Sequence, residues 1–440
     1  MLNYKNAKTC QKPLGYSQIR EYYENSCKKD TKFGLEYERA AVNSFDFKNA
    51  SYDHLEKIIK NFAHMKGWGV LYDDKTIIGA MGEGSSISLE PGCQFELSLE
   101  AKEKLEDIEN NTREIFSLAD RIAKFYNVEF LCCGITPFST YKNIDIVKKQ
   151  RYEIMAQNLP EYGRLAPVMM RETAGVQLNI DYESEKDAIK KIKFLASISP
   201  FLTGFYANSP IRENKLSGFK SFRAFAWKYT GKNRCSLFYK DLLDKPGADF
   251  DSYINAILDV PMLFFERGNK KIPLNSQITF REFMSRGHDG HFATLEDYIL
   301  HSSLCFPDIR LKKCIEIRNH DSQSLPFAMS VAAFYKGILK SDFDEILYRF
   351  KDINSQDLDI MGHLAARYGL NFKFKNFDAA LFTKKLFETA YNNLQTDEKH
   401  YLDCALELIG SNKCVSDRML EAGVCSAGTL VDFLKTDAGR

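Results

Sequence analysis

Hydrophobic and polar residues alternate with a period of two over short stretches near the start of the chain. In residues 31–42, apolar side chains alternate with Glu36 and Glu38. This is the pattern of a strand with one buried face. Glycines and Pro91 separate further stretches of this kind, so we expect an antiparallel meander. Its other predicted strands are 69–72, 76–81, 87–89 and 94–99.

A helical period governs other segments and nearly everything beyond Pro326. The predicted helices are 17–28, 52–65, 102–126, 184–197, 327–339, 343–350, 357–368, 378–392 and 399–410. Further extended segments are predicted at 128–135, 173–181, 218–229, 260–266 and 309–318. Regular β-α-β alternation is missing, so the pattern indicates an α+β fold with a largely antiparallel sheet. We expect a sheet domain over 1–325 and a helical C-terminal region over 326–440 packed on it.

Composition and charge narrow the class of protein. The chain has 440 residues, of which 44% are hydrophobic and 27% charged, and this excludes disordered, collagenous and small disulfide-rich proteins. Its net charge of +1 provides no overall field toward nucleic acid or anionic membranes, so we expect neither partner. The 11 cysteines form no metal-binding spacing and suggest a reducing compartment. With no apolar run at the N-terminus, we predict a cytoplasmic protein.

Carboxylates embedded in strand sequence are the main chemical signal. Glu36 and Glu38 lie at i and i+2 and therefore point from one face of a strand. They could lie on a solvated edge strand, paired with lysines. However, other strands repeat polar residues at this spacing, which favours the lining of a wet site, and converging carboxylates suit Mg²⁺ or Mn²⁺. The other polar residues concerned are Glu90, Glu96, Gln177, Asn179, Glu316 and Arg318.

Arginines and glycines bear on which substrates such a site could take. Arginine clamps carboxylates and phosphates, so its presence beside metal-binding glutamates suggests an acidic substrate together with a nucleotide. The alternative for each arginine is a surface ion pair, most plausibly for Arg234 and Arg310. The glycines at 79, 82 and 84 lack the spacing of a phosphate-binding loop and are better interpreted as a turn. The candidate arginines are Arg151, Arg223, Arg234, Arg310 and Arg318.

Seven ordered motifs between residues 33 and 328 resemble the plant and proteobacterial type of glutamate–cysteine ligase. They are FGLEYE, SLEPGCQFELS, RYEIM, MMRETAGVQLNID, FYANSPIRENKLSGFKSFRAFAW, LDVPM and FPDIRLKKCIEIR. The resemblance implies a glutamine-synthetase-like fold, in which a curved antiparallel sheet forms a funnel backed by helices. It also implies a ligase that joins the γ-carboxyl of L-glutamate to the amine of L-cysteine through a γ-glutamyl phosphate. Such an enzyme uses ATP and Mg²⁺ in the first step of glutathione synthesis, and residues 1–325 would be its catalytic domain.

The resemblance also implies roles for individual residues. The positions matching metal-binding residues are Glu36, Glu38, Glu90, Glu96, Gln177 and Glu316. Arg151 and Arg223 match arginines that hold glutamate, and Arg318 matches the arginine that meets the transferred phosphate, so Arg318 and Arg223 are the expected catalytic residues. Trp227 matches a tryptophan that closes the glutamate pocket, although it could instead pack in the core. Thr173 and Asn179 match residues that line that pocket.

Departures from the family pattern leave alternatives open. Leu263 stands where the plant enzymes have a tyrosine, so a carboxylate–amine ligase with a different amine acceptor stays an alternative. No cysteine occurs in 273–294, so the regulatory disulfide of the plant enzymes should be absent. Cys93, which replaces a glycine, is either a tolerated small residue or redox-sensitive. A non-catalytic ligand-binding protein with the same fold is a further alternative. The expected partners are the small substrates, and the chain could be a monomer or a homodimer.

Overall fold

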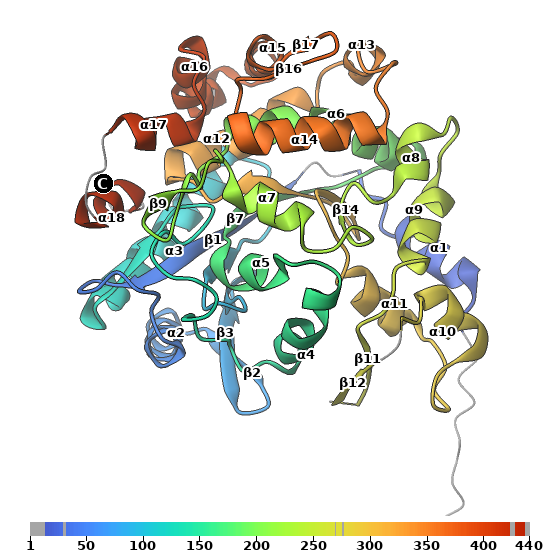
Figure 1. The fold of residues 1–440 in the computed structure, drawn as a ribbon, viewed down its shortest axis with the longest axis horizontal. Coiled ribbons are helices and arrows are strands. Elements are labelled where there is room, and N and C mark those ends of the chain that lie inside the picture. The colour runs from blue at the N-terminus through green and yellow to red at the C-terminus, as the bar shows by residue number, and fades with distance from the viewer. Residues whose placement is uncertain (1–13, 30–31, 269, 275–276, 423–426, 436–440) are drawn as a thin grey trace, which may run out of the picture.

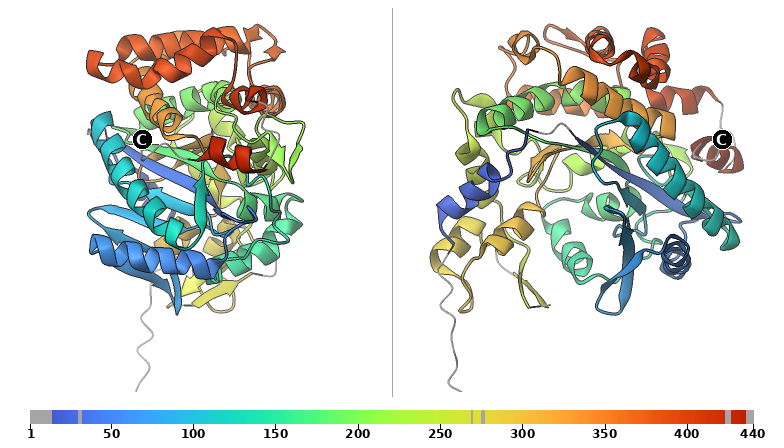
Figure 2. Two further views of the ribbon diagram at one scale, coloured as in Figure 1. Left: turned by 90° about the vertical axis from the view of Figure 1, so that its left-hand side faces the viewer. Right: turned by 180° about the vertical axis from the view of Figure 1, so that it is seen from behind.

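An antiparallel sheet of nine strands forms the centre of the molecule. The structure is a computed structural model that describes residues 14–29, 32–268, 270–274, 277–422 and 427–435. The strands run in the order β14 (Ile309–Leu311), β15 (Ile315–Asp321), β7 (Gly175–Ile180), β1 (Phe33–Asn43), β5 (Phe95–Ser98), β4 (Ser85–Leu89), β3 (Thr76–Gly82) and β2 (Gly69–Asp73). The ninth strand, β6 (Val128–Leu131), pairs with the second half of β1. Figures 1 and 2 show that the strand direction rotates across the sheet.

The two faces of β1 differ in chemistry as its sequence predicts. Leu35 and Tyr37 are fully buried on one face, whereas Glu36 and Glu38 on the other are only half-buried. Because β1 is paired on both sides, with β5 and β7, its carboxylates lie in the middle of the sheet and not on an edge. The alternative of a solvated edge strand is therefore wrong.

Helices cover the apolar face of the sheet. The helices that contact the sheet include α3 (Leu105–Phe125), α6 (Glu185–Phe205) and α12 (Leu325–Ile338), and a further helix, α2 (Tyr52–Lys66), contacts β2 and β3. A further layer packs on α6 and α12, and it contains α13 (Phe343–Tyr348), α14 (Ser355–Tyr368), α15 (Ala379–Asn393), η2 (Thr396–Leu402) and α16 (Asp403–Gly410). Figure 1 shows this layer in orange and red at the top of the molecule, followed by α17 (Val415–Glu421) and α18 (Ala427–Leu434).

Shorter helices lie across the polar face of the sheet. Those nearest the site are α4 (Gln150–Asn158), η1 (Leu159–Glu161), α5 (Ala166–Glu172) and α7 (Phe222–Lys228). The other helices are α1 (Tyr16–Glu24), α8 (Lys240–Asp244), α9 (Phe250–Leu258), α10 (Phe280–Arg286) and α11 (Leu295–Ser302). Two-stranded ribbons complete the described part: β8 (Ile211–Arg212) with β9 (Lys215–Leu216), β10 (Cys235–Ser236) with β13 (Phe306–Pro307), β11 (Phe264–Arg267) with β12 (Lys270–Pro273), and β16 (Lys373–Phe374) with β17 (Phe377–Asp378).

This architecture confirms the predicted α+β class and the helical C-terminal region. Two local predictions are wrong. The segment 218–229 was expected to be extended, but Ser221 accepts a hydrogen bond from the Ala224 N–H and starts helix α7. The segment 309–318 was expected to be one strand, but it turns at Lys312, and β14 and β15 form a hairpin. The boundary between domains at residue 325 stays a prediction.

Gly92 allows a close contact between two backbone segments on the polar side of the sheet. It lies in the turn between β4 and β5, where a Cβ atom would come within 2.2 Å of the Arg171 carbonyl oxygen. We expect Gly92→Ala to lower the free energy of unfolding by about 1–3 kcal/mol in urea denaturation. The added methyl group would clash with the Arg171 backbone, which cannot move aside as the end of a flexible side chain can. Gly410→Ala is the control, since nothing lies within 4 Å of its added methyl group. Equal stability of the two variants would contradict this account.

Candidate active site

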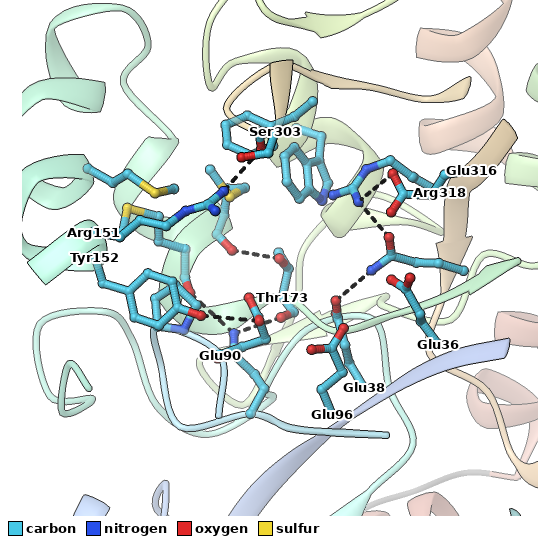
Figure 3. A pocket seen from close by; sticks show the side chains of 18 of the residues that line it. Glu36, Glu38, Glu90, Glu96, Arg151, Tyr152, Thr173, Ser303, Glu316 and Arg318 are labelled. Carbon is cyan, nitrogen blue, oxygen red and sulfur yellow. Dashed lines mark hydrogen bonds and ion pairs between the residues drawn. The ribbon is translucent and has the colours of Figure 1, made fainter. Parts of the chain in front are cut away.

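A cavity of about 340 Å³ opens on the polar face of the sheet. The sheet contributes Glu36, Glu38, Glu96, Ser98, Gln177, Arg310, Glu316 and Arg318 to its lining. The opposite wall comes from the turn after β4, from α4 and α5, and from residues near α7 and α11, namely Glu90, Pro91, Gln94, Lys149, Arg151, Tyr152, Met155, Met169, Met170, Thr173, Trp227, Ser303 and Phe306. Figure 3 shows Glu36, Glu38, Glu96, Glu316 and Arg318 on one side of the cavity and Arg151, Tyr152 and Glu90 on the other.

The register of the strands brings the predicted carboxylates together. Glu38 on β1 stands directly opposite Glu96 on β5, and Glu36 stands opposite Gln177 on β7. Like charges directly opposite each other on a sheet are destabilising. Glu38 and Glu96 are 58 residues apart in the sequence, so the sequence alone does not reveal this pairing. It results from the antiparallel pairing of β1 with β5.

Burial and mutual repulsion disfavour charge on these glutamates. Burial, and then the charge of Glu90, raise the pKa of Glu38 to about 7. Burial also raises the pKa of Glu96 well above its ordinary value, with repulsion from Glu90, Glu36 and Glu38 adding to it. A cation in the cavity would remove this penalty.

One or two hydrogen bonds hold each of these carboxylates in place. Asn179 Nδ2 donates to Glu36 over 2.8 Å, and Gln177 Nε2 donates to Glu38 over 2.8 Å. Glu38 also accepts from the Gly175 N–H over 2.6 Å. The remaining donors are Ser88 to Glu96, over 2.7 Å, and Tyr152 to Glu90, over 3.2 Å. Most of the oxygen lone pairs are therefore available to a further ligand.

The carboxylates suit a hard divalent cation in chemistry, but they do not form a finished cage. Four glutamates and an amide oxygen offer the donors that Mg²⁺ prefers. In the part of the chain that the structure describes, no three acidic, histidine or cysteine side chains converge closely enough to hold one ion. Binding a cation would thus require side-chain rotation, which the relief of repulsion favours.

Glu316 has different surroundings from the other predicted metal ligands. Its carboxylate accepts from Arg310 over 2.5 and 3.0 Å and from Lys312 over 2.9 Å, and Arg318 lies 3.3 Å away. Burial opposes its ionisation, yet Arg310, Lys312 and Arg318 together lower the pKa of Glu316 well below its ordinary range. Arg310 is buried in this contact and is no surface ion pair, because the hairpin places it opposite Glu316.

Arg318 connects this charged group to the floor of the cavity. Its Nη1 donates to Gln177 Oε1 over 2.6 Å, so Gln177 bridges Arg318 and Glu38. The guanidinium lies 5.6 Å from the centre of the Trp227 ring, a cation–π distance. Trp227 lines the cavity and also packs 5.6 Å from Phe306, so it serves the site and the packing together.

Cations on α4 face the carboxylates across the cavity. Arg151 donates only to the Ser303 carbonyl oxygen, over 3.0 Å, among the described residues. Lys149 was not predicted; its ammonium group lies 4.8 Å from the centre of the Tyr152 ring and has no carboxylate partner in the described ranges. Burial lowers the pKa of Lys149 and that of Arg151. The motif RYEIM contains Arg151 and Tyr152, and Lys149 lies two residues before it, but nothing in this spacing places Lys149 and Tyr152 at a cavity.

Of three further predicted substrate-binding residues, one lines the cavity and two do not. Thr173 lines the cavity and donates to the Met169 carbonyl oxygen over 2.6 Å. Asn179 lies in the sheet behind Glu36 and does not line the cavity. Arg223 is buried behind Trp227 and lines an adjoining cavity of about 30 Å³ instead. Arg234 is buried far from solvent and donates to the Leu304 and Pro261 carbonyl oxygens, so its role is structural.

The remaining candidates have structural explanations. Cys93 is 1% exposed, and burial raises its thiol pKa to about 12, which makes it a poorly reactive small residue. Leu263 is buried in the core and does not line the cavity. Glu83 and Gly84 form the turn between β3 and β4, so the glycine-rich stretch is a hairpin, as predicted.

A twisted antiparallel sheet that presents carboxylates opposite guanidinium groups defines the class: a ligase of the glutamine-synthetase-like fold. The chain belongs to glutamate–cysteine ligase family 2, whose sequence model matches residues 32–437. The ligase chemistry predicted from the motifs, glutamate–cysteine ligation as the first step of glutathione synthesis, is thereby confirmed.

Individual relatives agree with this family. The chain is 29% identical over 430 residues to the chloroplastic glutamate–cysteine ligase of Medicago truncatula, covering 95% of this chain and 84% of the relative. It is 28% identical over 427 residues to the chloroplastic enzyme of Arabidopsis thaliana, covering 95% and 81%. A glutamate–cysteine ligase of Francisella tularensis, solved in complex with AMP, shares the fold with a TM-score of 0.59 and 13% identity, over 93% of this chain and 88% of that one.

The relatives correct the predicted location. These curated plant enzymes are chloroplastic, which overturns the prediction of a cytoplasmic protein. Within the described ranges, the helices are too short or too polar to cross a lipid bilayer.

Glu38 should make the stability of the metal-free protein depend on pH. The unfolded chain releases this proton near 4.5 and the native state near 7, so the native state binds more protons between these values. The contribution of Glu38 to stability therefore falls as the pH rises from about 4.5 to about 7. His301 and His320, whose pKa values burial lowers to about 3, act in the opposite direction.

The test therefore compares Glu38→Gln with the parent protein. In urea unfolding with EDTA, we expect the variant to gain roughly 2 kcal/mol over the parent between pH 5 and pH 8. If the difference in free energy of unfolding between the variant and the parent protein stayed constant from pH 5 to pH 8, this would contradict the raised pKa of Glu38.

Proposed function

We propose that this ligase consumes ATP, with Mg²⁺ as cofactor, to form a γ-glutamyl phosphate from L-glutamate, which the amine of L-cysteine then attacks. One observation carries the proposal. The cavity separates crowded carboxylates on β1 and β5, with Arg318 beside them, from cations at the start of α4 that have no carboxylate partner in the described structure. Such a layout accommodates a metal-bound polyphosphate at one side and an amino acid carboxylate at the other.

The carboxylate side would hold the metal. Glu36, Glu38, Glu90 and Glu96 are the proposed ligands. Gln177 is also expected from the family pattern, but its amide oxygen accepts from Arg318, so it is proposed to border the metal through that contact. When bound, Mg²⁺ neutralises phosphate charge and orients the nucleotide for in-line transfer. Glu316, proposed as a further ligand from the family pattern, is here committed to Arg310 and Lys312. Its rotation toward a metal would free Arg310 and Arg318 for the phosphate.

The cationic side would hold glutamate. Arg151 and Lys149 are proposed to bind its α-carboxylate, and Trp227 and Thr173 to close the pocket around its side chain. Arg223 and Asn179 would act from behind this wall, through Arg318 and Glu36 respectively. The placement of Arg223 outside the cavity lining makes its contact with glutamate indirect.

Arg318 is proposed to serve both chemical steps. In the first, the γ-carboxylate oxygen attacks the γ-phosphorus of ATP, and ADP leaves. In the second, the neutral amine attacks the acyl carbon, phosphate leaves, and the amine loses a proton. Charge accumulates on oxygen in both steps, and a guanidinium fixed by Gln177 stabilises it without reorganising.

Two alternatives remain distinct from this proposal. A different amine acceptor was kept open because of Leu263, but that side chain is enclosed and does not reach the cavity. A non-catalytic binding protein would have to tolerate Glu38 facing Glu96 with no cation to offset their repulsion. Both considerations favour the glutamate–cysteine reaction. A monomeric or homodimeric state stays a prediction.

Product analysis tests the function directly. The protein is incubated with glutamate, ATP, Mg²⁺ and one amine from a panel that contains cysteine, 2-aminobutyrate, alanine and glycine. We expect ADP release to be fastest with cysteine and mass spectrometry to detect γ-glutamylcysteine. Faster turnover with another amine would identify that amine as the acceptor in place of cysteine. If no amine gave ADP release, the alternative of a non-catalytic binding protein would be favoured.

Glu36→Gln tests the proposed metal site. The substitution keeps the side-chain volume and removes one negative ligand, so we expect kcat to fall at least about 10²-fold and the Mg²⁺ requirement to rise. Circular dichroism should show an intact fold. Glu100→Gln, which changes an exposed carboxylate just beyond β5, is the control and should retain parental turnover. Near-parental turnover of Glu36→Gln would rule out its role as a metal ligand.

A further inference from the structure

A buried carboxylate outside the cavity organises one of its walls. Asp321, at the end of β15, is 1% exposed. Its Oδ2 accepts from the Asn208 N–H over 2.7 Å and from Ser209 Oγ over 2.6 Å, and its Oδ1 accepts from Ser221 Oγ over 2.8 Å. Gly134 permits this position, because a Cβ there would lie 2.3 Å from the Asp321 carboxyl carbon. A charged group so fully enclosed needs these donors to stay ionised.

Ser209 and Ser221 connect the Asp321 carboxylate to the start of α7. Ser221 is the N-cap residue of α7, and its Oγ accepts from the Ala224 N–H over 3.0 Å while donating to Asp321. Ser209 Oγ accepts from the Arg223 N–H over 3.1 Å and likewise donates to Asp321. One carboxylate therefore fixes two hydroxyl groups in the orientation that holds the first turn of α7.

Arg223 and Asp321 are also electrostatic partners. No hydrogen bond joins their side chains in the described structure, but Asp321 is the largest influence that opposes the lowering of the Arg223 pKa by burial. Arg223 in turn is the largest influence that opposes the raising of the Asp321 pKa by burial. The guanidinium of Arg223 donates to the Arg318 carbonyl oxygen over 2.9 Å and lies 5.9 Å from the centre of the Trp227 ring.

The geometry points to Asp321 as a positioning residue that locks α7 to the end of β15 and thereby fixes Trp227 and Arg318 against the substrate cavity. This inference rests on the proposed function, because it assigns Asp321 an effect on glutamate. Asp321 does not line the cavity and acts through Ser209, Ser221 and Arg223. The two sides of this wall come from α7 and β15, and Trp227 and Arg318 are 91 residues apart in the sequence.

Asp321→Asn tests the inference. The asparagine side chain keeps the shape of aspartate but replaces one acceptor oxygen with an NH₂ donor. This donor would have to face the Asn208 N–H, Ser209 or Ser221, each of which donates to Asp321 in the parent protein. We expect kcat/KM for glutamate to fall about 10²-fold, mainly through KM, because small misplacement of a binding wall has large kinetic effects. Glu398→Gln is the matched control. Glu398 is a buried carboxylate that accepts from Lys336 and the Leu105 N–H, remote from the cavity, so its loss should lower Tm without changing glutamate KM.

Tryptophan fluorescence provides a readout independent of activity. The chain has two tryptophans, so Trp68→Phe leaves Trp227 as the only one. In this background, we expect Asp321→Asn to raise acrylamide quenching of Trp227 at least twofold, whereas Glu398→Gln leaves it unchanged. A double-mutant cycle with Arg223→Lys should show that its kinetic effect and that of Asp321→Asn are not additive.

The kinetic and the fluorescence measurements together distinguish failure of the inference from failure of the proposed function. If the parent protein does not ligate glutamate, the proposed function falls, and the quenching arm still decides whether Asp321 positions Trp227. If Asp321→Asn does not fold, Ser209→Ala combined with Ser221→Ala removes the same clamp and keeps the carboxylate. Unchanged quenching together with unchanged glutamate KM, in either folded variant, overturns the inference.

Discussion

The opposition of Glu38 and Glu96 across neighbouring strands is the constraint on which the site depends. Sheet geometry forces these carboxylates together at the centre of the polar face, where neither can turn away toward bulk water. The chain tolerates this only with protons or cations present, and its own cations are placed elsewhere: Arg310 and Lys312 neutralise Glu316. The fold thus stores an unfavourable charge arrangement that binding of a divalent cation relieves.

Under the proposed function, the same separation would let the cavity take two kinds of anion. Polyphosphate would approach the carboxylates only as a metal complex, whereas an amino acid carboxylate would be attracted to Lys149 and Arg151. A free anion would be repelled by Glu38 and Glu96, and a metal ion by the cations at the start of α4. Electrostatics would then orient the substrates before any specific hydrogen bond forms.

Much of this could be predicted from sequence, for reasons that particular residues illustrate. Period-two alternation was enough to place Glu36 and Glu38 on one face, and long amphipathic patterns located α3, α6 and the C-terminal helices. The cross-strand partner of Glu38 was not predictable, because register depends on the whole meander. Arg310 was misjudged because the alternation of apolar and charged residues in 309–318 is that of one strand and conceals a turn at Lys312. Lys149, Tyr152 and Asp321 were missed because short helices and strand ends acquire their neighbours only through tertiary packing.

Leu263 shows how the core restricts change in this protein. Its side chain is enclosed, and its carbonyl oxygen accepts the Leu274 N–H over 2.9 Å at the base of the ribbon formed by β11 and β12. A larger side chain in this enclosed position would overpack the core, so the neighbouring side chains would have to change with it. Residue 263 therefore acts on the protein through packing volume, at a distance from the chemistry of the cavity.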